Sequence, residues 1–131
     1  MHGLGASRGT AKGKVRIVKS AVEADDFRKG DILVTVMTDP SMTHILAKAS
    51  GIICDIGGIT SHASILAREM GIPCVVNSKK ATEILKDGME VHLDGESGEV
   101  HLLVPSVQKQ EVWIDDFVEG LVKATAGPMD F

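Results

Sequence analysis

The chain has 131 residues, a length typical of one compact domain. Hydrophobic residues make up 44% of it, but it has only three Phe, one Trp and no Tyr, so its core must be largely aliphatic. A formal charge of -4 and so few aromatic rings argue against a nucleic-acid-binding protein. No apolar run is long enough to cross a bilayer and no signal peptide is visible, so we expect a cytoplasmic protein without a membrane span.

The first half of the sequence predicts strands that alternate with a helix. Glycines punctuate the first 14 residues, and the first predicted strand covers 15–18, followed by a second over 31–36. Asp39 and Pro40 are typical of a helix start, and Gly51 is expected to close that helix in a left-handed conformation. The apolar stripe of this helix is Met42, Ile45, Leu46 and Ala49. A buried strand is predicted over 52–56.

A repeat links this helix to the next one. A shift of 20 residues aligns 41–54 with 61–74, so that Ile-Leu-Ala, Gly-Ile and Cys fall in register. Two successive helix–glycine–strand units predict neighbouring parallel strands joined by a crossover. The copies differ where Met42, a core-type residue, corresponds to His62. Chance similarity between two amphipathic helices explains the apolar matches but explains the matched Gly-Ile-x-Cys less well.

The second half predicts a short helix and a hairpin. After Cys74-Val-Val76, Asn77 can form a turn, and a short helix is expected over 80–85. Strands over 90–94 and 99–103, joined by 95–98, read as a hairpin. Residues 105–131 are expected to form a C-terminal helix or linker outside a domain of residues 1–104. Cys54 and Cys74 are expected to be two buried free thiols.

A glycine pair leads directly into the second helix. Gly57 and Gly58 follow the buried strand, Thr60 or Ser61 can cap the helix, and His62 falls in its first turn. Free backbone N–H groups and the positive end of the helix dipole would then lie close to the imidazole, which predicts an anion-binding site. The residues expected to bind a phosphoryl group are Gly58, Ser61, Ala63, Ser64 and Arg68.

Several roles for His62 can be weighed from the residues alone. A general base has no adjacent nucleophile in the sequence, and a metal ligand would have only His44 as a near companion, so no metal site is predicted. A covalent nucleophile fits better, because a neutral imidazole can accept a phosphoryl group on one nitrogen while a hydroxyl such as that of Thr60 orients the other. A purely structural histidine is equally supported at this point.

The segment 58–68, Gly-Ile-Thr-Ser-His-Ala-Ser-Ile-Leu-Ala-Arg, resembles the phosphohistidine signature of the phosphoenolpyruvate-utilising enzymes. That family includes phosphoenolpyruvate synthase, pyruvate phosphate dikinase, enzyme I of the sugar phosphotransferase system and rifampicin phosphotransferase. The resemblance extends through 70–76, back to 5–9, and on to the glycine-punctuated segment 88–100, so it covers about residues 3–103. Asn77 and Ser64 depart slightly from the family pattern.

The resemblance implies an α/β fold, a single-domain layered β/β/α swivelling phosphohistidine domain. It implies that His62 is phosphorylated from ATP or phosphoenolpyruvate and passes the group to pyruvate or another acceptor, and that Thr60 contacts or regulates it. The implied partners are an ATP-grasp nucleotide-binding domain and a phosphoenolpyruvate/pyruvate barrel, in cis or in trans. Magnesium and ATP are expected at those partners, with no cofactor bound here.

A chain of this length has no room for either partner domain. We therefore expect a carrier that is part of an enzyme and does not complete the reaction by itself. Two alternatives are an enzyme I or antibiotic-phosphotransferase carrier, with another acceptor, and a non-catalytic interaction module of the same fold. Intact His62 and Thr60 argue against the second.

Overall fold

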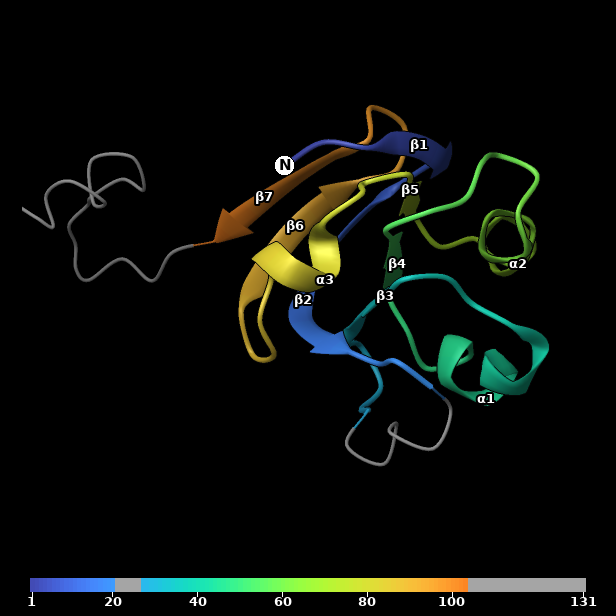
Figure 1. Ribbon diagram of the computed structural model, residues 1–131, viewed down its shortest axis with the longest axis horizontal. Helices are drawn as coiled ribbons and strands as arrows, with labels where there is room; N and C mark the ends of the chain where they lie inside the picture. The colour runs from blue at the N-terminus through green and yellow to red at the C-terminus, as the bar shows by residue number, and fades with distance from the viewer. Residues whose placement is uncertain (21–26, 104–131) are drawn as a thin grey trace, which may run out of the picture.

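The computed structural model describes residues 1–20 and 27–103. In this part of the chain one curled sheet has the strand order β1-β5-β4-β3-β2-β6-β7 (Figure 1). Its strands are β1 (Leu4–Ser7), β2 (Thr10–Ile17), β3 (Ile32–Thr35), β4 (Gly51–Cys54), β5 (Cys74–Val76), β6 (Glu90–Asp94) and β7 (Glu99–Leu103). The helical elements are the 3-10 turn η2 (Pro40–Met42), α1 (Thr43–Leu46), α2 (His62–Met70) and α3 (Ala81–Ile84).

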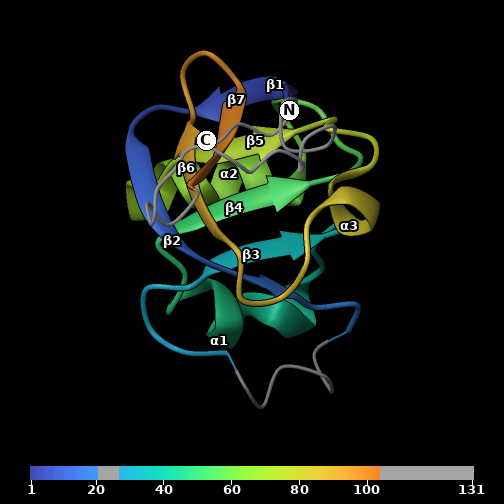
Figure 2. The ribbon, with the colours of Figure 1, turned by 90° about the vertical axis from the view of Figure 1, so that its left-hand side faces the viewer.

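Strand β2 joins the two halves of the sheet. Its last residues, from Val15 to Ile17, pair in parallel with β3, and its first residues pair antiparallel with β6. Strands β3, β4 and β5 continue the parallel half, and β1 closes its far edge antiparallel to β5. The β6–β7 hairpin therefore folds back over one face of the parallel strands, while α1 and α2 lie on the other side (Figure 2).

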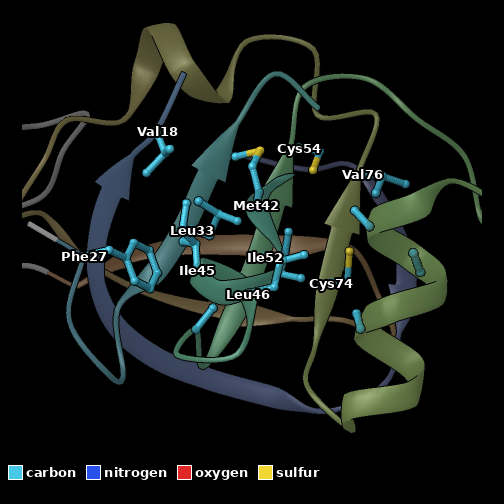
Figure 3. Packing of buried hydrophobic residues seen from close by; sticks show 14 residues of the cluster. Val18, Phe27, Leu33, Met42, Ile45, Leu46, Ile52, Cys54, Cys74 and Val76 are labelled. Carbon is cyan, nitrogen blue, oxygen red and sulfur yellow. The ribbon is translucent and has the colours of Figure 1, made fainter. Parts of the chain in front are cut away.

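Two hydrophobic clusters separate the three layers. Leu33, Ile52 and Cys54 belong to the cluster that contains Met42, Ile45 and Leu46 of the first helical unit, together with Ala63 and Ala67 of α2 (Figure 3). Ile32, Val34, Ile53 and Val75 alternate with these residues and pack in the cluster that contains Val91, Leu93 and Val100 of the hairpin. Alternation along a strand places successive side chains on opposite faces. The predicted α/β fold with β/β/α layers is confirmed.

Several local predictions are confirmed. The hairpin strands occupy 90–94 and 99–103 as expected, and Asn77 has a positive φ of 54° in the turn after β5. Strands β4 and β5 are parallel neighbours, as the repeat indicated. Cys54 and Cys74 are both free and buried. The helix or linker expected over 105–131 lies outside the described residues.

The glycine-rich start of the chain is more regular than predicted. It forms β1 and a β2 that begins at Thr10, where the sequence indicated a strand only over 15–18. Glycine weakens a strand in isolation, but here it permits close backbone contact. A Cβ on Gly5 would lie 2.5 Å from the Gly95 carbonyl oxygen, and one on Gly13 would lie 2.5 Å from that of Gly30.

The first helix is shorter than predicted. Asp39 caps it by accepting a hydrogen bond from the Ser41 N–H at 2.8 Å, but α1 ends at Leu46. The N–H groups of Lys48 and Ala49 bond three residues back, which tightens the chain into the following turn. Gly51 does not close the helix: it begins β4, where a Cβ would meet Leu93 at 2.8 Å. The other boundaries differ by one or two residues, as helix and strand ends commonly do.

The two thiols provide a test of this packing. Burial raises the pKa of the Cys54 thiol far above its ordinary value and that of Cys74 to about 12. Because the thiolate is the reactive form, native protein at pH 8 should react very slowly with a disulfide reagent such as DTNB, while unfolded protein should release two equivalents of thionitrobenzoate. Rapid reaction of either native thiol would contradict the buried environment of β4 and β5.

Candidate functional site

The loops that follow β3 and β4 meet at one edge of the sheet. Because β3 and β4 are parallel neighbours, their carboxyl ends lie side by side, and ligand sites of open α/β sheets form at such ends. The loop after β3 carries Thr38, and the loop after β4 carries the segment from Gly57 to Ser61 (Figure 1). Backbone bonds from Asp55 N–H to Thr35 oxygen and from Ile56 N–H to Val36 oxygen hold these loops together.

Helix α2 places His62 at this edge. The helix buries Ala63, Ser64 and Ala67 against the sheet, and it ends at Gly71 with a left-handed φ of 73°. Ser61 is its N-cap residue, and His62 is its first helical residue. The predicted start and end of this helix are therefore confirmed.

A hydroxyl group from the neighbouring loop contacts the imidazole. Thr38 Oγ1 and His62 Nδ1 lie 2.8 Å apart, and Thr38 is 5% exposed. Within the described residues no hydrogen bond engages Nε2 of His62, and the residue is only partly buried. The imidazole is thus held through Nδ1, and Nε2 makes no hydrogen bond to the described residues.

Hydrogen bonds from residues at the start of α2 hold the turn that precedes His62. Gly57 has a φ of 122°, a backbone conformation that residues other than glycine rarely adopt. The Gly58 carbonyl accepts hydrogen bonds from the Ser61 N–H at 3.0 Å and from the Ser64 hydroxyl at 2.7 Å. The Ser61 and Ser64 hydroxyls lie 3.0 Å apart. Among the described residues, the N–H groups of His62 and Ala63 have no hydrogen-bond acceptor, as expected for a helix start.

The structure gives some predicted residues other contacts than the sequence indicated. Thr60 is exposed and its hydroxyl makes no hydrogen bond to the described residues, so Thr38 takes the position expected for Thr60 at the imidazole. Ser64 is fully buried, and its hydroxyl donates a hydrogen bond to the Gly58 carbonyl. Its backbone N–H lies in the first turn of α2. Arg68 donates to the Ala6 and Ile59 carbonyl oxygens at 2.8 and 2.7 Å.

Sequence reasoning missed Thr38. The residue lies 24 positions before His62, and only the order of the strands brings the two together. A signal was present: Thr38 comes just after a predicted strand rich in Ile, Leu and Val and precedes the Asp39-Pro40 helix start, so it lies beyond the carboxyl end of that strand. A hydroxyl in that position is a candidate for contact with the residue that follows the next strand.

Exposed apolar side chains lie in the two loops next to the histidine. A cavity of about 110 Å³ is lined by His62, Thr38, Gly57 and Ser61 and by the side chains of Met37 and Ile56. Exposed fractions are 45% for Val36, 55% for Met37, 49% for Ile56 and 54% for Ile59. We refer to these four residues as the apolar rim. Met37 and Ile56 line the cavity together with His62, and Val36 and Ile59 lie in the same two loops.

Two further features of the described residues bear on function. No group of three or more His, Cys, Asp or Glu side chains comes together in a way that could hold a metal ion. No helix in the described ranges has the length and hydrophobicity needed to cross a membrane.

Comparison with protein families gives a match over residues 27–98 to the family described as PEP-utilising enzyme, mobile domain. The probable phosphoenolpyruvate synthase of Methanothermobacter thermautotrophicus is 54% identical over 101 residues, which cover 77% of this chain and 15% of that protein. The phosphoenolpyruvate synthase of Pyrococcus furiosus is 48% identical over 112 residues, covering 85% of this chain and 14% of that protein. The chain thus spans only about a seventh of these relatives.

Solved structures show the same relationship. The solution structure of an Enzyme I protein is 32% identical, with a TM-score of 0.54, over 61% of this chain and 33% of that one. Thermococcus kodakaraensis aconitase X is similar in fold alone, at 22% identity and a TM-score of 0.59 over 79% of this chain. With the family match over more than half of its length and relatives near 50% identity, the chain belongs to the mobile-domain family of the PEP-utilising enzymes.

Proposed function

We propose that this domain is a phosphoryl carrier in which Nε2 of His62 accepts a phosphoryl group and delivers it to an acceptor at another domain. The observation that carries the proposal is the contact between Thr38 Oγ1 and His62 Nδ1, at 2.8 Å, beside a helix start with free N–H groups. Membership of the mobile-domain family supports the same chemistry.

The Thr38 hydroxyl would select the reactive nitrogen. When the Nδ1–H of neutral His62 donates to Thr38 Oγ1, the lone pair of Nε2 is free to attack phosphorus. The bond from phosphorus to the donor's leaving group breaks as the Nε2–P bond forms, and the proton stays on Nδ1. The resulting imidazolium is a good leaving group, so attack by an acceptor oxygen returns neutral His62.

The helix start would stabilise the transferred group. A phosphoryl group on Nε2 carries negative charge, and the free N–H groups of His62 and Ala63 together with the helix dipole favour an anion there. Gly58, Ser61 and the Ser64 N–H lie in the same turn and complete the predicted phosphate-binding segment. We assign Mg²⁺ and ATP to the partner domains.

Partner domains would supply the donor and acceptor. The relatives named phosphoenolpyruvate synthase are about seven times as long as the segment they share with this chain. We propose an ATP-grasp nucleotide-binding domain and a phosphoenolpyruvate/pyruvate barrel, in cis or in trans, as the two partners. The apolar rim would bury against each of them in turn, which also removes water from the reactive phosphohistidine.

Chemical phosphorylation tests the carrier proposal without any partner. Phosphoramidate should transfer its phosphoryl group to His62 with release of ammonia, giving an acid-labile, base-stable adduct whose ³¹P resonance is that of Nε2-phosphohistidine. His62→Ala should give no such adduct, while His101→Ala, which removes an exposed histidine of the hairpin, should label normally. Equal labelling of the wild type and the His62→Ala variant would refute the proposal.

Two threonine variants test which hydroxyl orients the imidazole. Thr38→Val removes the bond to Nδ1, and the loss of about 1 kcal/mol expected for a neutral hydrogen bond should change the ratio of the two His62 tautomers about fivefold. Long-range ¹H–¹⁵N spectra of the imidazole report that ratio. Thr60→Val is the matched control and should leave the spectrum unchanged. A change caused by Thr60→Val alone would restore the role first expected for Thr60.

Charged substitutions test the role of the apolar rim. Met37→Glu or Val36→Glu should slow phosphoryl transfer from the partner domains at least tenfold, because a carboxylate in a desolvated interface costs well over 1.4 kcal/mol. Labelling by phosphoramidate, measured in parallel, should be little affected. Leu102→Glu, on the exposed surface of β7, is the control and should affect neither reaction. Unchanged transfer in both rim variants would show that the partners bind elsewhere.

A further inference from the structure

The guanidinium group of Arg68 connects three separate parts of the fold. Arg68 lies in the last turn of α2; its Nη1 donates to the Ala6 carbonyl of β1 at 2.8 Å, and its Nη2 donates to the Ile59 carbonyl at 2.7 Å. Ile59 belongs to the turn that leads into His62. One side chain therefore fixes that turn to both the helix and the edge strand.

Strand β1 is irregular at the residue that Arg68 contacts. The pairing of β1 with β5 shifts between Gly5 and Ser7, so Ala6 is the extra residue of a β-bulge. A bulge leaves one residue outside the ladder, and its carbonyl then needs another donor. Arg68 supplies that donor. The bulge of the edge strand thus presents the carbonyl that Arg68 contacts.

Two consecutive carbonyl groups of the turn are held toward the helix. The Gly58 carbonyl accepts from Ser64 and the Ile59 carbonyl accepts from Arg68, one helical turn further along. All the described peptide bonds are trans, and in a trans peptide the C=O and N–H groups point in opposite directions. The N–H groups of Ile59 and Thr60 therefore point away from Ser64 and Arg68, and they have no acceptor among the described residues.

We propose that Arg68 is a positioning residue for the phosphoryl group on His62. By holding the Ile59 carbonyl, it directs the Ile59 and Thr60 N–H groups outward, where they bind the phosphoryl oxygens. Arg68 itself contacts carbonyl oxygens and not the phosphate. This inference rests on the carrier function proposed above, and it replaces the direct phosphate contact that the sequence indicated for Arg68.

Arg68→Lys separates positioning from charge. Lysine keeps the positive charge, but its single ammonium group lacks the planar fork that spans two carbonyl oxygens. We expect the rate of phosphorylation of the 131-residue chain by phosphoramidate to fall about tenfold, the loss expected from one hydrogen bond to a charged group. Arg8→Lys is the matched control: Arg8 is exposed and makes no side-chain hydrogen bond to the described residues, so the rate should not change.

Amide spectra give a readout that general loss of stability would not produce. In ¹⁵N-labelled wild-type protein, phosphorylation should move the Ile59 and Thr60 amide protons strongly downfield, as expected when an N–H donates to an anionic oxygen. Arg68→Lys should lose these shifts while the remaining spectrum stays that of the folded domain. Ser64→Ala, which removes the side-chain hydrogen bond to the adjacent Gly58 carbonyl, should weaken the Ile59 shift and provides a second variant should Arg68→Lys fail to fold.

The outcomes distinguish the two proposals. Wild-type rate and wild-type amide shifts in Arg68→Lys would overturn the positioning role, since charge alone would then suffice. A slow Arg68→Lys variant that keeps both amide shifts would also overturn it, because Arg68 would then act directly on the phosphate. If the wild type itself gave no adduct on His62, the carrier function would fail, and the positioning role with it.

Discussion

The central strands of this domain are buried on both faces, and the other elements follow from that constraint. Every residue of β3, β4 and β5 is buried. A sheet of this kind needs a covering layer on each side, which α1 and α2 provide on one face and the β6–β7 hairpin on the other. Since both faces of these strands are covered, polar side chains that reach solvent can lie only at the strand ends.

The carboxyl edge concentrates these polar groups because the strands are parallel. Thr38 and His62 follow adjacent strands, and the Asp55 carboxylate at the end of β4 accepts hydrogen bonds from the N–H of Thr82 at 3.1 Å and from its hydroxyl at 2.6 Å. The same edge thereby anchors the start of α3. His62 is placed at this edge by α2, and its imidazole is held there by the hydroxyl of Thr38, which follows the neighbouring strand.

The sequence was informative where structure is local. Alternation located the hairpin, and the capping residues located both ends of α2, because those signals depend on neighbours in the chain. It was uninformative where contacts depend on strand order. The Thr38–His62 bond joins a loop to the start of α2, the Arg68 bond reaches Ala6 at a bulge, and Gly5 and Gly13 make close backbone contacts inside strands. Residue propensities carry no information about such contacts.

The internal repeat explains why the site needs both copies. Met42 and His62 hold corresponding positions, but Met42 is 1% exposed in the core whereas His62 lies partly exposed at the edge. The loop that precedes the first copy contributes Thr38, and the second copy contributes the imidazole. Because β3 and β4 are adjacent parallel strands, the loops that follow them and lead into the two copies meet side by side. A single unit would offer either a hydroxyl or a histidine, and only the pair yields an imidazole fixed through Nδ1 with Nε2 free.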